Sequence, residues 1–140
     1  SLDAFTAARR ELGRSTPRNK IEHMELVDSR DLGRFRELDV VASMQPSHLT
    51  YATQRQNYND ARLGGRVRWA FAWHAMEDAG APLAFGTDWP VMALDPRVGL
   101  FAAATRLNFD GGPAGGWTPG QRITLADAVR HYTEGSAYAA

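Results

Sequence analysis

The carboxylate of Asp88 follows a short apolar run, Pro82 to Phe85, that is long enough to form a buried strand. Gly86 ends this run, and Pro90 rules out regular strand pairing soon afterwards. A carboxylate at the carboxyl end of a strand is typical of parallel α/β barrels, in which the strand ends carry the catalytic groups. Asp88 could there bind a metal, act as a general base, or do both. Asp88 could instead only cap the turn after the strand, because aspartate is common in turns.

One histidine, His23, could share a metal ion with Asp88. His23 lies within Lys20 to Val27, a segment that we expect to be a strand. Adjacent parallel strands lie about 4.8 Å apart, so an imidazole and a carboxylate reaching inward from nearby strand ends can meet at one ion. Zinc suits nitrogen and oxygen ligands and lowers the pKa of its bound water towards ~7. A neighbouring carboxylate can then accept the proton of that water.

Plainer roles remain open for these side chains. His23 could be a hydrogen-bonded histidine of the core, and His48 could be an ordinary loop histidine rather than a substrate contact. Trp89, beside Asp88, could form a wall of a substrate pocket. A serine triad of Ser43, His48 and Asp88 is disfavoured, because the sequence lacks the Gly-x-Ser-x-Gly turn that such a serine needs. Two protein ligands also fall short of the three that a catalytic zinc site normally has.

Composition restricts both the metal ligands and the partners. The 140 residues contain no cysteine, which excludes disulfides and thiolate metal sites. Lys plus Arg equals Asp plus Glu, so the formal net charge is zero, which argues against a nucleic-acid surface. No apolar run approaches the roughly 20 residues of a membrane span, and no signal-peptide pattern opens the chain. We therefore expect no nucleic-acid or membrane partner, and a cytoplasmic location.

The elements that would position these residues alternate between helix and strand. Residues 49–65 are polar and predict a long connection that lines or lids a site. Hydrophobic periodicity and capping residues predict the others. In chain order these are a helix from Leu2 to Leu12, a strand over 20–27, a helix over 28–38, a strand over 40–44, a helix over 66–79, a strand over 82–85, a helix over 95–107 and a helix from Thr124 to about Tyr132.

This alternation predicts an α/β fold with a parallel sheet and right-handed crossovers. With a period of two, Ile21, His23 and Glu25 would share one face of the first strand. Three strands are too few to close a barrel, so we expect the chain to form only part of one. Such a piece would leave two strand edges bare.

Three motifs in order resemble one family. Ile21-Glu-His23, Ala42-Ser-Met-Gln-Pro-Ser-His48 and Phe85-Gly-Thr-Asp-Trp-Pro-Val91 resemble the metal-dependent amidohydrolase superfamily. The most similar group is its amidohydrolase 3 subgroup, which includes N-substituted formamide deformylase. The resemblance implies that residues 1–140 are the C-terminal part of a (β/α)8 TIM barrel domain. The chain would supply three parallel strands, the sixth to the eighth, with their flanking helices.

The same resemblance implies roles for single residues. His23 matches a sixth-strand histidine that binds a divalent metal, for which we expect zinc. Asp88 matches the eighth-strand aspartate, which binds the metal and takes a proton from the attacking water. His48 matches a histidine after the seventh strand, for which we expect a substrate contact. The first-strand His-x-His pair of the family, its fourth-strand lysine or acid and its fifth-strand histidine have no counterpart in these residues.

We therefore expect part of a hydrolase that acts on carbon–nitrogen bonds other than peptide bonds, in small amide-type substrates, with a metal-activated water as nucleophile. The chain alone should bind metal weakly or not at all, should be inactive, and should self-associate into a homo-oligomer through its exposed barrel edges. The alternative is a non-catalytic fragment or self-associating module without activity of its own.

Overall fold

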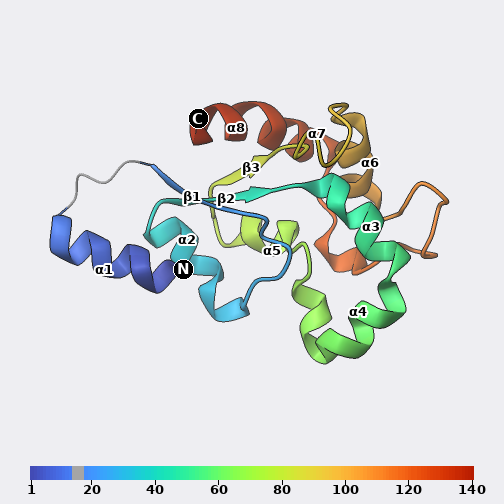
Figure 1. Ribbon diagram of the computed structural model, residues 1–140, viewed down its shortest axis with the longest axis horizontal. Helices are drawn as coiled ribbons and strands as arrows, with labels where there is room; N and C mark the ends of the chain where they lie inside the picture. The colour runs from blue at the N-terminus through green and yellow to red at the C-terminus, as the bar shows by residue number, and fades with distance from the viewer. Residues whose placement is uncertain (14–17) are drawn as a thin grey trace.

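A parallel three-stranded sheet lies at the centre of the computed structural model, which describes residues 1–13 and 18–140. The strands are β1 (Asn19–Glu22), β2 (Val40–Met44) and β3 (Leu83–Phe85), and they lie in the order β1-β2-β3. Ile21 is opposite Ala42, and Ala42 is opposite Leu83. In Figure 1, α2 and α5 lie below the sheet, and α7 and α8 lie above it. The predicted α/β class with three parallel strands is confirmed.

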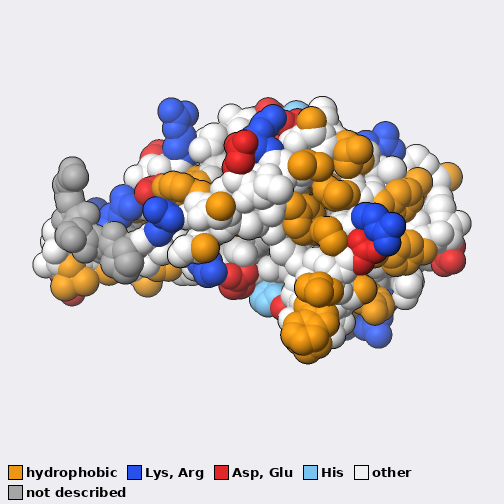
Figure 2. Space-filling view, turned by 90° about the horizontal axis from the view of Figure 1, so that it is seen from above, with side chains coloured by type: hydrophobic (Ala, Val, Ile, Leu, Met, Phe, Trp, Pro, Cys, Tyr) orange, Lys and Arg blue, Asp and Glu red, His pale blue; other side chains and the backbone are white. Residues whose placement is uncertain are grey.

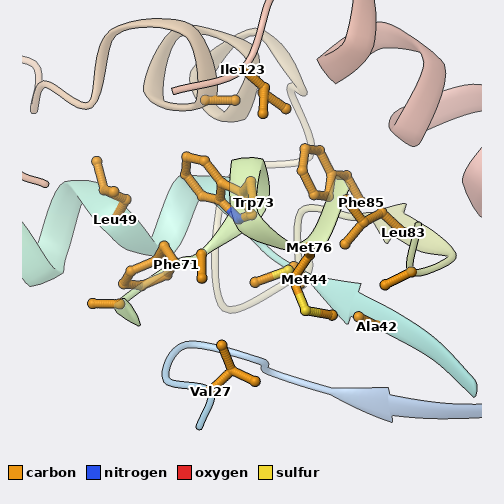
Figure 3. Close-up of a cluster of buried hydrophobic side chains, with 14 of the residues drawn as sticks. Val27, Ala42, Met44, Leu49, Phe71, Trp73, Met76, Leu83, Phe85 and Ile123 are labelled. Atoms are coloured by element: carbon orange, nitrogen blue, oxygen red, sulfur yellow. The ribbon is translucent and has the colours of Figure 1, made fainter. Parts of the chain in front are cut away.

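The main core forms where one face of β2 and β3 packs on helices. Ala42 and Met44 of β2 lie on the same face as Leu83 and Phe85 of β3, and all four are at most 4% exposed. Figure 3 shows these side chains around Trp73, which is fully buried. β3 is buried along its whole length, as its short apolar sequence predicts.

Eight α-helices surround the sheet in the described residues, and three of them begin within two residues of a predicted start. The Asp28 carboxylate accepts a hydrogen bond from the Arg30 N–H at 3.0 Å, and Thr124 Oγ1 accepts one from the Asp127 N–H at 3.0 Å. None of the helices in the described part of the chain has the length and apolar character that crossing a bilayer requires. The helices are α1 (Leu2–Leu12), α2 (Leu32–Glu37), α3 (Leu49–Gln54), α4 (Gln56–Leu63), α5 (Trp73–Asp78), α6 (Arg97–Thr105), α7 (Leu125–Arg130) and α8 (Ser136–Ala139).

The predicted helix over residues 66–79 is wrong in its first half. Residues Gly64–Trp69 form a 3₁₀ helix, the chain extends through Ala70, and Phe71 has a φ of 47° before α5 begins at Trp73. The cause is a buried guanidinium: Arg106 donates to the carbonyls of Phe71 at 2.8 Å and of Ala70 at 3.0 Å. These two carbonyls are therefore bound by a side chain instead of by the next helical turn.

The C-terminal helix covers the outer edge of β3. After α7 the chain forms a π-helical turn, His131–Gly135, and continues into α8. A Cβ built on Gly135 would lie 2.1 Å from the Leu83 carbonyl oxygen, so the helix touches the strand backbone. The Ser136 hydroxyl donates to the Phe85 carbonyl at 2.6 Å. The prediction of two bare strand edges is therefore wrong at β3, and β1 forms the other edge of the sheet.

Hydrophobic side chains gather on one face of the molecule. Figure 2 shows them over the end of the structure where α6 and α7 lie. Exposed large side chains on these two helices are Phe101, Leu125 and Val129, between 39% and 56% exposed. This is apolar surface that the described chain leaves open to solvent.

Candidate metal centre

His23 and Asp88 both stand where a strand ends, on backbone that few side chains adopt. β1 ends at Glu22 and β3 at Phe85, and both His23 and Asp88 have a φ of 59°. A non-glycine residue with left-handed backbone costs of order 1–3 kcal/mol, and such residues cluster at functional sites. The predicted strand over 20–27 is therefore wrong beyond Glu22.

The chain turns at His23 because the segment after it pairs with another part of the fold. The Glu25 N–H donates to the His23 carbonyl at 2.8 Å, and the Phe71 N–H donates to the Glu25 carbonyl at 2.8 Å. Leu26 forms an antiparallel bridge with Ala70. The predicted common face of Ile21, His23 and Glu25 is therefore wrong, since the strand alternation stops before His23.

The three strand ends bring His23, His48 and Asp88 together. One ligand atom from each lies within 4.8 Å of the others. His48 Nε2 is 3.3 Å from Asp88 Oδ2, and the rings of His23 and His48 stack with centroids 5.7 Å apart. The His48 side chain is 15% exposed and that of Asp88 is 30% exposed, so a small ligand can reach the group. Two imidazoles and a carboxylate are a ligand set that zinc accepts.

Glu25 fixes how His48 presents its ring. Glu25 Oε1 lies 3.0 Å from His48 Nδ1. An ionised carboxylate only accepts hydrogen bonds, so Nδ1 carries the proton and a neutral ring presents a lone pair at Nε2. Nε2 is buried and has no hydrogen-bond partner among the described residues, although Asp88 Oδ2 is 3.3 Å away. At this separation the lone pair of His48 Nε2 and the Asp88 carboxylate oxygen repel each other unless a cation or a proton lies between them.

Sequence reasoning missed Glu25 as part of this group. Arg18 and Lys20 are within reach of Glu22 and Glu25 in the sequence, so ion pairs are the simplest expectation for both acids. The structure confirms this for Glu22, whose carboxylate lies 3.5 Å from the Lys20 ammonium, whereas Glu25 contacts His48. No local pattern signals the contact, because the turn at His23 is what directs Glu25 towards His48.

Comparison with known proteins gives the family. The model of the amidohydrolase family matches residues 1–140. The chain belongs to the amidohydrolase family. The family predicted from the three motifs is thereby confirmed.

The curated relatives of this chain include proteins from a plant and a bacterium. Protein LONG AFTER FAR-RED 3 of Arabidopsis thaliana is 30% identical over 99% of this chain, which matches 23% of the relative. The putative amidohydrolase YtcJ of Bacillus subtilis is 24% identical over 96% of this chain, which matches 26% of the relative. The chain thus spans about a quarter of the length of the curated relatives that it matches.

Solved structures with the same fold come from two archaea. A metal-dependent hydrolase from Pyrococcus horikoshii has a TM-score of 0.78 and is 29% identical, with 99% of this chain and 27% of that chain covered. A metal-dependent hydrolase from Pyrococcus furiosus has a TM-score of 0.69 and is 28% identical, with 99% of this chain and 26% of that chain covered.

This amidohydrolase chain also has a hollow of about 510 Å³ beside His48. Its lining includes Tyr51 and Arg55 from the region of α3 and α4, together with Val91 and Met92. Residues 49–65, predicted as a long connection that lines or lids a site, form the two helices α3 and α4, and part of this segment does line the hollow. Trp89 is 65% exposed and is not among the residues that line it.

Proposed function

We propose that this chain is part of a metal-dependent hydrolase that acts on carbon–nitrogen bonds other than peptide bonds, in small amide-type substrates. Its three parallel strands would be the sixth to the eighth of a (β/α)8 barrel. Membership of the amidohydrolase family and the two archaeal metal-dependent hydrolases support this proposal. The resemblance to N-substituted formamide deformylase makes formamides the first substrates to test.

The observation that carries the proposal is the convergence of His23, His48 and Asp88 within 4.8 Å. His48 Nε2, without a partner among the described residues and 3.3 Å from Asp88 Oδ2, leaves room at this point for a positively charged or hydrogen-donating group. His23 and Asp88 would hold a divalent metal, for which we propose zinc. The bound ion would supply Lewis acidity that lowers the pKa of water.

The side chains of this group then have separate tasks. Asp88 accepts the proton of the attacking water, because a carboxylate beside that water is a suitable general base. His48, oriented by Glu25, presents Nε2 to the substrate next to Asp88. Trp89, which is exposed beside Asp88, contacts the part of the substrate that extends out of the site towards solvent.

A shortage of ligands favours a second proposal for the isolated chain. A catalytic zinc site normally has three protein ligands and an open position, and the family's ligands from the first, fourth and fifth strands have no counterpart in residues 1–140. The isolated 140 residues would then bind zinc weakly and hydrolyse no amide.

Two variants of the complete protein in which this sequence occurs test the site. His23→Ala should remove bound metal, and Asp88→Asn should lower turnover by about 100-fold or more, because it removes the proton acceptor. Metal content is measured by mass spectrometry of the purified protein, and turnover by hydrolysis of formanilide. His74→Ala is the control, because His74 is a half-exposed helix residue 3.5 Å from Asp78. Unchanged metal content and turnover in both site variants would refute the assignment.

A further inference from the structure

The buried side-chain amide of Gln45 has a hydrogen-bond partner for its nitrogen but none, among the described residues, for its oxygen. The residue is 6% exposed and follows the last residue of β2. Its Nε2 donates to Glu22 Oε2 at 3.2 Å. Its Oε1 is buried and has no hydrogen-bond partner among the described residues. A buried acceptor without a donor costs free energy, so such an atom calls for an explanation.

Gln45 lies on the face of the sheet opposite to the main core. Glu22 is opposite Ser43 in the parallel register, and side chains alternate along a strand, so Ser43 and Gln45 share a face that Met44 does not. The hydrogen bond between Gln45 and Glu22 agrees with this placement. In a barrel this face would point to the interior.

The free oxygen of Gln45 belongs to the same end of the sheet as the metal ligands. His23 directly follows Glu22, and the His48 N–H donates to the Gln45 carbonyl at 3.0 Å. The orientation of the amide is fixed, because turning it over would place Oε1 against the Glu22 carboxylate, where two acceptors repel each other. Glu22 therefore fixes the Gln45 amide so that Oε1 is the atom left without a partner among the described residues.

We propose that Gln45 Oε1 accepts a hydrogen bond from the N–H of the substrate, so that the site prefers primary and secondary amides to tertiary amides and esters. This inference rests on the proposed hydrolysis of amide-type substrates. A substrate without an N–H leaves the buried oxygen unpaired in the complex, and sites that hydrogen-bond a substrate group discriminate strongly against analogues that lack it.

Paired substrates test the preference in the complete protein. Formanilide and acetanilide carry an N–H, and N-methylformanilide and N-methylacetanilide do not. We expect kcat/KM to be roughly 10-fold or more higher for the N–H member of each pair, as for one hydrogen bond to a buried group. Gln45→Met should remove this ratio by slowing the N–H substrates while leaving the N-methyl substrates unchanged. A purely structural role would slow all four alike and would overturn the inference.

The matched control is Gln56→Met. Gln56 is another glutamine whose Nε2 donates to a carboxylate, Asp60 Oδ2 at 3.3 Å, but it lies on α4 outside the group. This variant should keep the wild-type ratio. If Gln45→Met does not fold, Glu22→Gln serves instead, because an amide at residue 22 no longer fixes the Gln45 amide. The ratio should then fall several-fold, and an unchanged ratio would overturn the inference.

Binding to the metal-depleted protein separates this inference from the proposed function. Ligand-observed NMR would compare the dissociation constants of formanilide and N-methylformanilide. We expect formanilide to bind about 10-fold more tightly in the wild type, and equally in Gln45→Met. That result without any hydrolysis of the four amides would sustain the N–H contact and refute the hydrolase. Hydrolysis without an N–H preference in either measurement would refute the contact and sustain the hydrolase.

Discussion

The buried environment of Tyr132 should make the stability of the fold depend on pH in the alkaline range. Burial raises the pKa of Tyr132 above its usual value of 10.0. Its ring packs edge-on against Phe85, with centroids 5.6 Å apart, and its hydroxyl lies 3.4 Å from the Gly86 carbonyl. A phenolate at this position would lose hydration without gaining a cation, so the folded chain holds the proton more tightly than the unfolded chain does.

Stability should therefore fall as pH rises above 10. Below pH 10 both states keep the Tyr132 proton; above it only the unfolded chain releases the proton, which favours unfolding by at most about 1.4 kcal/mol per pH unit. Urea unfolding followed by circular dichroism at pH 8 and pH 11 measures this loss. Tyr132→Phe should lose less stability between the two pH values than the wild type. An equal loss in both proteins would contradict the prediction.

Trp89 should affect specificity rather than stability. Trp89 is 65% exposed and directly follows Asp88, so truncation removes little buried surface but changes the surroundings of the site. In the complete protein, Trp89→Ala should change the ratio of kcat/KM between formanilide and acetanilide while the melting temperature stays nearly constant. Trp73→Ala is the contrast, because Trp73 is fully buried and its truncation should cost about 3–5 kcal/mol. A large stability loss with an unaltered ratio would make Trp89 a core residue.

The sequence predicts some members of the site and not others, for a physical reason. His23, His48 and Asp88 follow strands, and parallel strands bring their carboxyl ends to one edge of a sheet, so their proximity follows from the order of elements. Glu25 joins them only because the chain turns at His23, where φ is 59°. Histidine is enriched among the few non-glycine residues with positive φ, but most histidines do not adopt it, so the residue type alone does not predict the turn.

At the scale of elements, strand bounds and helix caps depend on nearby residues and can be predicted from them, whereas the break before α5 depends on a residue far away in the sequence. Val40–Met44 has the bounds that its apolar run predicts. The helix expected over residues 66–79 has a suitable apolar stripe, yet Arg106, 36 residues beyond Ala70, binds the carbonyls that would continue it. A contact at that separation overrides local propensity and leaves no mark in the segment that it changes.

The contact between the C-terminal helix and β3 depends on the absence of a side chain at Gly135. A Cβ there would lie 2.1 Å from the Leu83 carbonyl oxygen, and backbone cannot move away cheaply. Gly135→Ala should therefore lower the free energy of unfolding by about 1–3 kcal/mol, as overpacking does. Chemical denaturation measures the change.

The control for this variant is Gly33→Ala in α2. Gly33 is exposed, and a Cβ added to it would meet no atom within 4 Å, so alanine should be neutral there or stabilise by up to about 1 kcal/mol. If Gly135→Ala were also neutral or stabilising, the helix would not be in contact with the strand in solution.

At the scale of the molecule, we expect the isolated chain to associate. β1 is an edge strand in the described structure, and Phe101, Leu125 and Val129 add exposed apolar surface. Strand edges and apolar patches of this kind favour pairing of two copies about a two-fold axis. Sedimentation analysis between low and high micromolar concentration should show a dimer that dissociates on dilution. A monomer at every concentration would contradict the expectation.

The cover that Gly135 and Ser136 place on β3 limits how far such association can go. A sheet with two open edges is bivalent: each added copy offers a new end, and growth has no natural stop. With the β3 edge covered by its own helix, β1 is the one strand edge that the described structure leaves open, so strand pairing would use it up on both partners. Association through strand edges should therefore stop at a pair, whereas two open edges would allow an open-ended polymer.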